Sequence, residues 1–143
     1  MRLIGKLLSW LPAIAWASTL YSLSSRSAVP DIPSWFSAHD KVTHAIAFGL
    51  LASLIQFALL RAHRLRFLPA ACIAWLLTTA YGGLDELHQR FTPGRVSDIA
   101  DWIADMTGAA LALALLALLA YSYRRITPRT TPPITSDCRG RMN

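Results

Sequence analysis

Residues 67–95 read FLPAACIAWLLTTAYGGLDELHQRFTPGR, an apolar run that ends abruptly in a cluster of polar residues. The run at 67–84 contains no Asp, Glu, Lys or Arg. Its length falls within the roughly 17–25 residues that a membrane-spanning helix needs. A further apolar run begins soon after the cluster, at residue 102. The stretch therefore indicates two membrane helices joined by a polar segment at the membrane boundary.

Apolar runs of this kind occur four times, at about 7–23, 42–60, 67–84 and 102–123. In lipid, a single run satisfies its own backbone hydrogen bonds only as a helix. The 54% content of hydrophobic residues is also high for a chain of 143 residues. We predict an all-α integral membrane protein with one domain, a bundle of four transmembrane helices over residues 1–126. The segment 127–143 is rich in Pro, Thr and Arg, which predicts a disordered basic tail.

The first apolar run has a second interpretation. Arg2 and Lys6 precede it, and Ala15-Trp16-Ala17 has the small-x-small form of a signal-peptidase site. The bulky Trp16 and the apolar residues beyond it favour a retained helix, so cleavage stays the alternative.

Lys and Arg residues are distributed unevenly between the two sides of this topology. The N-terminus, the link between the second and third helices and the tail share one side, and they carry Arg2, Lys6, Arg61, Arg64, Arg66, Arg124, Arg125, Arg129, Arg139 and Arg141. The other side carries only Arg26, Lys41, Arg90 and Arg95. The positive-inside rule then predicts both termini in the cytoplasm of a plasma (inner) membrane protein. The basic composition is therefore a topology signal, and we predict no nucleic-acid partner.

Polar residues at the start of the second helix form the first part of a candidate site. Asp40 and His44 are four residues apart and share a helix face, and Lys41 lies between them. Asp40 also suits a helix N-terminus by charge–dipole attraction. His44 is therefore either a structural residue at the interface or a functional one.

The end of the third helix presents an electrostatic conflict. Asp85 and Glu86 lie at a helix C-terminus, where acids oppose the helix dipole, and Gln89 shares their face. Compensation must come from Arg90, Arg95 or a bound cation. Conflicts of this kind are typical of functional sites. Pro93 and Gly94 predict a tight turn, which would hold Arg95 near the acids to pair with a carboxylate or an anionic ligand.

Acids also mark the start of the fourth helix. Asp98, Asp101 and Asp105 are spaced i, i+3, i+7 and lie on one face. The first two suit a helix N-terminus. Asp105 lies inside the membrane edge and needs a partner: His44, His88, Arg95 or a proton. Gly108, with Ala109 and Ala112, offers a small face for close helix packing.

These residues predict one outward-facing polar cleft. Its candidate ligand-binding residues are Asp40, Lys41, His44, Asp85, Glu86, Gln89, Arg95, Asp101 and Asp105, and its candidate catalytic residues are Glu86, His44 and Asp101. The spacing matches no standard metal motif, because Asp85-Glu86-x-His88 lacks the paired histidines of a zinc helix. From the spacing alone we therefore predict no metal site, and the sequence identifies no cofactor.

Three motifs in order resemble the VanZ-like family over about residues 20–120: Asp40-Lys41-x-x-His44-x-x-x-Phe48, Asp85-Glu86-x-x-Gln89-x-Phe91-x-Pro93-Gly94-Arg95, and Asp101-x-x-x-Asp105-x-x-Gly108. The family's usual pattern has Asn where this chain has Asp105. The resemblance implies a small multi-helix membrane protein with a role in the cell envelope. The family's namesake confers low-level resistance to teicoplanin, a lipoglycopeptide that acts at the outer membrane surface.

Three kinds of function remain open at this point. The first is a binding protein whose cleft recognises a membrane lipid, a cell-wall precursor or a glycopeptide antibiotic. The second is a membrane-embedded enzyme that acts on a lipid-linked phosphate or ester, with Glu86 or Asp101 as general base. The third is a structural or assembly protein in which the polar residues lock helix ends together.

Overall fold

The computed structural model describes residues 3–26, 39–93 and 97–127 of the chain. In these ranges all regular secondary structure is helical: α1 (Leu3–Ser24), α2 (His39–His63), α3 (Phe67–Gln89) and α4 (Ile99–Ile126). All four helices are long and apolar enough to cross a membrane. The predicted all-α bundle of four transmembrane helices is therefore confirmed.

The helices extend beyond the apolar runs that predict them. α2 begins at His39 and α3 continues to Gln89, so the charged residues of both predicted motifs lie on helical turns. The reason is that polar side chains at a membrane boundary reach water, while the helical backbone hydrogen bonds continue beneath them. The predicted disordered tail at 127–143 lies, apart from Thr127, outside the described residues.

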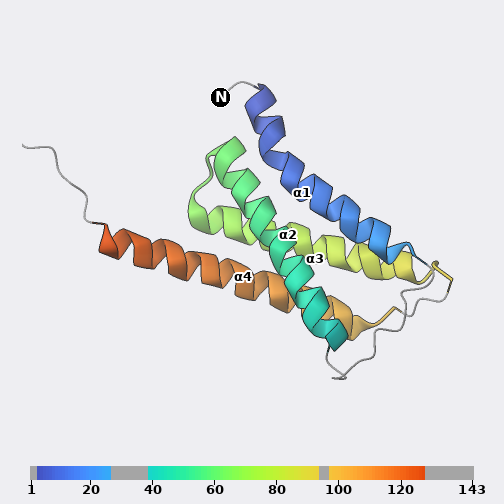
Figure 1. Cartoon of the computed structure of the whole chain (residues 1–143). Helices are drawn as coiled ribbons and strands as arrows, with labels where there is room; N and C mark the ends of the chain where they lie inside the picture. The colour runs from blue at the N-terminus through green and yellow to red at the C-terminus, as the bar shows by residue number, and fades with distance from the viewer. Residues whose placement is uncertain (1–2, 27–38, 94–96, 128–143) are drawn as a thin grey trace, which may run out of the picture.

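The helices alternate in direction, and α2 packs against each of the other three (Figure 1). The C-terminal ends of α1 and α3 and the N-terminal ends of α2 and α4 consequently lie at the same end of the bundle. We call this the polar end, because it carries the candidate site residues between Asp40 and Asp105. The opposite, basic end carries the described basic residues Lys6, Arg61, Arg64, Arg66, Arg124 and Arg125.

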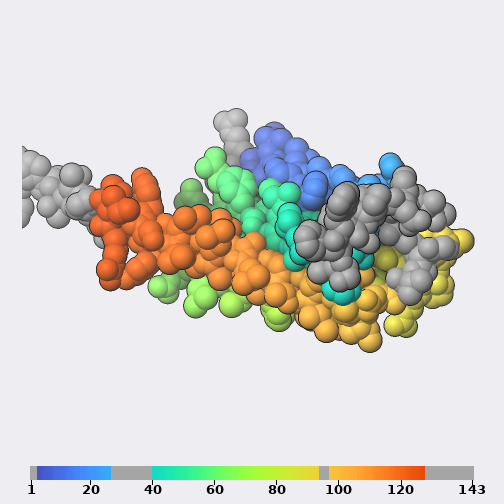
Figure 2. Space-filling view, turned by 60° about the horizontal axis from the view of Figure 1, so that its bottom comes forward, coloured from blue at the N-terminus to red at the C-terminus, as the bar shows by residue number. Residues whose placement is uncertain are grey.

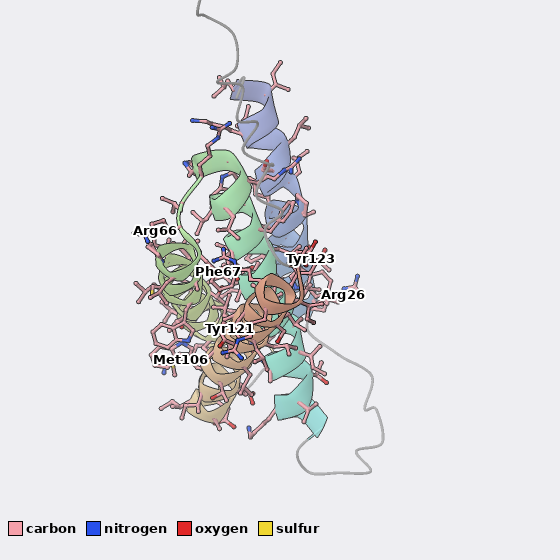
Figure 3. All side chains as sticks on the ribbon, turned by 90° about the vertical axis from the view of Figure 1, so that its left-hand side faces the viewer. Arg26, Arg66, Phe67, Met106, Tyr121 and Tyr123 are labelled. Atoms are coloured by element: carbon pink, nitrogen blue, oxygen red, sulfur yellow. The ribbon has the colours of Figure 1, made fainter. Side chains whose placement is uncertain are left out.

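Large apolar side chains cover the outside of the bundle, and small ones occupy many positions of its interior beside buried residues such as Phe48 and Leu51. Side chains project outward around all four helices (Figure 3), and Leu68 and Leu111, for example, are 72% and 66% exposed. By contrast, the fully buried positions include many alanines: Ala52, Ala58, Ala70, Ala74 and Ala109. This distribution suits lipid outside and close helix contact inside. The C-terminal half of α4 extends beyond the other helices (Figure 2).

The closest helix contact joins α2 to α4. A methyl group on Gly108 would overlap the backbone of Ala45. One turn further along, a methyl group on Gly49 would lie 3.0 Å from the carbonyl oxygen of Gly108. The small face predicted around Gly108 is thus the surface on which α4 meets α2, and only glycine allows this approach at residue 108.

Indole N–H groups join neighbouring helices through backbone carbonyl oxygens. The bonds run from Trp16 to Ala47 at 2.9 Å, from Trp75 to Met106 at 3.2 Å and from Trp102 to Thr79 at 3.0 Å. The Tyr81 hydroxyl donates in the same way to the carbonyl of Ala17 at 2.6 Å. Each polar tip of a large aromatic side chain is thereby satisfied in an apolar setting, and each bond fixes one helix against another.

The substitution Gly108→Ala tests the α2–α4 contact. We expect it to lower the free energy of unfolding by about 1–3 kcal/mol, because the added methyl group forces the two backbones apart. Thermal unfolding of the purified protein in detergent measures the effect. Gly83→Ala is the matched control: its methyl group would lie 3.5 Å from the Trp102 ring, an ordinary contact. Equal melting of Gly108→Ala and wild type would contradict the packing described here.

Candidate functional site

Lys41 connects α2 to the start of α4 at the polar end. Its ammonium group lies 3.0 Å from Asp98 Oδ2 and 2.8 Å from Asp101 Oδ1. The Asp101 side chain is largely buried, whereas Lys41 and Asp98 are partly open to solvent. Lys41 therefore neutralises part of the acidic face of α4, and it holds the first turns of the two helices together.

His44 and Asp105 form a second, deeper connection between α2 and α4. His44 Nδ1 lies 3.0 Å from Asp105 Oδ1, and the Asp105 side chain is only 1% exposed. Of the partners considered from the sequence for Asp105 that the structure describes, His44 and His88, the one it contacts is His44. The connection between His44 and Asp105 follows from the close contact between Gly108 and Ala45. His44 adjoins Ala45 in α2, and Asp105 lies one turn before Gly108 in α4.

Glu86 lies at the N-terminus of α4 although it belongs to α3. Its Oε2 accepts a hydrogen bond from the backbone N–H of Asp98 at 2.9 Å. A carboxylate at the end of its own helix is unfavourable, but the positive end of the α4 dipole compensates it. The conflict seen in the sequence is therefore relieved in part by a neighbouring helix, a partner that the sequence does not reveal.

Asp98 caps α4. Its Oδ1 accepts from the Ala100 N–H at 2.9 Å, as expected of an N-cap residue. This backbone hydrogen bond and the Lys41 ammonium group hold the pKa of the Asp98 carboxyl below its usual range. Asp98 consequently stays ionised at neutral pH and keeps both of its contacts.

Several buried carboxylate oxygens at the polar end have no hydrogen-bond partner within the described residues. They are Asp85 Oδ1, Glu86 Oε1 and Asp105 Oδ2. Asp85 uses its other oxygen to accept from Gln89 Nε2 at 2.9 Å. Burying a carboxylate oxygen without a partner is costly. The polar end therefore carries acceptors that a cation, a donor group of a ligand or a proton would satisfy.

His88 and the turn after α3 lie apart from this network. His88 Nε2 lies 3.1 Å from the hydroxyl of Ser25, and its ring contacts that of Tyr21. It therefore faces α1 and is not the partner of Asp105. Pro93 is exposed in a turn, as its sequence predicts. Gly94 and Arg95 lie outside the described residues, so the predicted role of Arg95 stays a prediction.

A cleft of about 370 Å³ opens between the end of α3 and the start of α4. Glu86, Arg90 and Ser97 contribute its polar groups, and Trp102 is part of its apolar wall. Sequence reasoning treated Arg90 only as a counter-charge and did not single out Trp102. Two features of the sequence could have indicated these residues. Glu86 and Arg90 are spaced i, i+4 and so share a helix face, and Trp102 lies in the first turn of a membrane helix, where tryptophan is common.

Asp40, His44 and Asp101 approach one another on the α2–α4 side of the polar end. One possible ligand atom from each lies within 4.8 Å of the other two. Asp101 is buried, His44 is half-buried and Asp40 is exposed. The predicted candidates that the structure describes thus fall into three groups: this trio with Lys41 and Asp105, Glu86 with its contact to Asp98, and the Asp85–Gln89 pair.

Comparison with known protein families identifies a relationship. The model of the VanZ/LLP1 family matches residues 4–120, which include the whole of the polar end described above. No curated protein and no solved structure matches the chain.

A double-mutant cycle tests the buried connection between His44 and Asp105. We expect His44→Ala to lower the free energy of unfolding by about 1–3 kcal/mol, because it leaves a buried carboxylate without its partner. Adding Asp105→Ala should restore part of that loss. Thermal unfolding in detergent gives both values. As control, His63→Ala at the basic end should combine additively with Asp105→Ala. Additive effects of His44→Ala and Asp105→Ala would show that the two side chains do not interact.

Proposed function

The chain belongs to the VanZ/LLP1 family, and from that premise we propose that it binds the polar head of an amphiphile at the outer surface of the plasma membrane. The candidate ligands are a membrane phospholipid, a lipid-linked cell-wall precursor and a glycopeptide antibiotic such as teicoplanin. The observation that carries the proposal is the cleft between α3 and α4, where charged groups and apolar walls meet at one end of a membrane bundle.

The composition of the cleft supports an amphiphilic ligand. Glu86 is 7% exposed and offers a carboxylate to an amine, whereas the exposed Arg90 offers a guanidinium to a phosphate or carboxylate. Leu87, Ile99 and Trp102 line the same cleft and suit the apolar part of such a molecule. A ligand that carries both charges next to an acyl chain would match all three features.

The charge distribution supports an outward-facing cleft. The described basic residues outside the candidate site gather largely at the basic end, and acids gather at the polar end. The positive-inside rule favours a basic end in the cytoplasm, with both termini inside and the cleft outside. The polar end would then meet ligands of the cell envelope directly.

The candidate catalytic residues already make contacts between helices. Glu86 accepts from the Asp98 N–H, His44 contacts Asp105, and Asp101 contacts Lys41. These contacts support a role in holding or binding a ligand, whereas the enzyme alternative predicts turnover of a lipid-linked substrate that is lost in Glu86→Gln.

Teicoplanin susceptibility of a sensitive host tests the proposed function. We expect expression of the wild type to reduce susceptibility, and we expect Glu86→Gln and Arg90→Gln to abolish that protection, because each substitution removes one charge from the cleft. Glu86→Gln keeps an oxygen for the Asp98 N–H and so preserves the contact with α4. The readout is the minimal inhibitory concentration.

Membrane abundance of each variant is the necessary control, together with Arg61→Gln at the basic end, which should protect like the wild type. Loss of Glu86→Gln protein from the membrane would support the structural alternative. Abundant variants that protect as well as the wild type would contradict a role for this cleft in resistance.

Accessibility of introduced cysteines tests the orientation. In a background without Cys72 and Cys138, we expect Thr92→Cys at the polar end to react with a membrane-impermeant maleimide in intact cells. Arg61→Cys at the basic end should react only after lysis. The opposite pattern would place the cleft in the cytoplasm and exclude an envelope ligand.

A further inference from the structure

Three side chains with metal-ligating groups come together from α2 and α4, outside the amphiphile cleft. One ligand atom each from Asp40, His44 and Asp101 lies within 4.8 Å of the others. Ligand atoms bound to one cation at about 2.1 Å lie no more than about 4 Å apart. The exposed Asp40 and the half-buried His44 are the side chains with room to rotate and close the difference. We propose that Asp40, His44 and Asp101 form a binding site for a divalent cation of the Mn²⁺ type.

Asp105 prepares His44 for this role. A histidine that binds a metal through one ring nitrogen usually donates from the other nitrogen to a carboxylate, which fixes the ring and its tautomer. Here Asp105 Oδ1 lies 3.0 Å from His44 Nδ1, and in the neutral tautomer whose Nδ1 donates to this carboxylate, Nε2 is the acceptor. Asp105 is 1% exposed, and its Oδ2 has no hydrogen-bond partner within the described residues. A cation on His44 would thus also compensate this buried carboxylate.

The charge of the surroundings supports a cation. Within the described segments 24–26, 39–48, 82–93 and 97–108, three basic residues, Arg26, Lys41 and Arg90, stand against six carboxylates: Asp40, Asp85, Glu86, Asp98, Asp101 and Asp105. Three of these carboxylates have buried oxygens without a described partner. Such an excess at a membrane boundary is costly. A divalent cation would reduce it at the position where two of the acids and an imidazole already converge.

The donor set favours a particular class of metal. Two carboxylates and one imidazole suit Mn²⁺ and similar cations, whereas soft metals prefer thiolate. Three protein donors would leave coordination positions open for water or for a ligand. Lys41 lies 2.8 Å from Asp101 and therefore competes with the cation for this carboxylate. Its remaining contact with Asp98 would hold the ammonium group when the metal is bound.

Mn²⁺ binding to the full chain, purified in detergent and treated with chelator, tests the site. Free Mn²⁺ gives a strong paramagnetic resonance signal that is lost on binding, so titration yields the Kd without any activity. We expect saturable binding to the wild type. Asp40→Asn and His44→Gln should each raise the Kd by about tenfold or more. Pulsed resonance should detect an imidazole nitrogen on the bound ion in the wild type and not in His44→Gln.

Lys41→Met provides a test in the opposite direction. Removal of the competing ammonium group should lower the Kd by about threefold, the ratio expected for an interaction between partly exposed charges. A merely structural role for Lys41 predicts no such gain. Asp40→Asn changes an exposed side chain, so misfolding will not obscure its result, and His63→Gln at the basic end should bind like the wild type. The proposal is overturned if the wild type does not bind Mn²⁺, or if the Kd is the same in Asp40→Asn, His44→Gln and the wild type.

Discussion

The approach of Gly108 to the backbone of Ala45 sets the position of α4 relative to α2, and the polar end depends on it. Both helices begin at this end, so each step of one turn toward their N-termini brings a new pair of side chains together. His44 then meets Asp105, and Lys41 meets Asp101. A wider separation would lengthen both contacts, and it would leave the buried Asp105 carboxylate without its partner at a cost of several kcal/mol. Packing of small residues and pairing of charged ones are therefore a single constraint in this bundle.

Helix dipoles explain why so many acids are tolerated at one end. The N-termini of α2 and α4 both point there, and they favour Asp40, Asp98 and Asp101. Only α3 presents its C-terminus with acids, and its Glu86 accepts a hydrogen bond from the N-terminal backbone of α4. The cleft that supports the proposed function lies beside this junction, so a ligand there would contact groups whose orientation the fold already fixes. Preorganisation of this kind lowers the entropic cost of binding.

Local features of the fold could be predicted from the sequence, whereas pairings between helices could not. The lengths of the four apolar runs were enough to predict four membrane helices, and the spacing around Gly108 predicted a close-packed face. The partner of Asp105 remained one of several possibilities, because a sequence does not define the register of one helix on another. For the same reason, no spacing rule could find Asp40, His44 and Asp101 as a trio, since Asp101 belongs to a different helix. The apolar runs alone stop short of the helix ends, because the apolar signal ends where polar side chains reach water while the backbone remains helical.

The indole groups that join the helices also make the assembly of the bundle optically visible. Trp16 reports on the contact between α1 and α2, whereas Trp75 and Trp102 report on the two sides of the contact between α3 and α4. An indole whose N–H is bonded to a carbonyl within the bundle emits differently from one released into lipid headgroups or water. Intrinsic fluorescence therefore carries separate signals from two helix interfaces, and variants that retain one tryptophan at a time would show in which order those interfaces form.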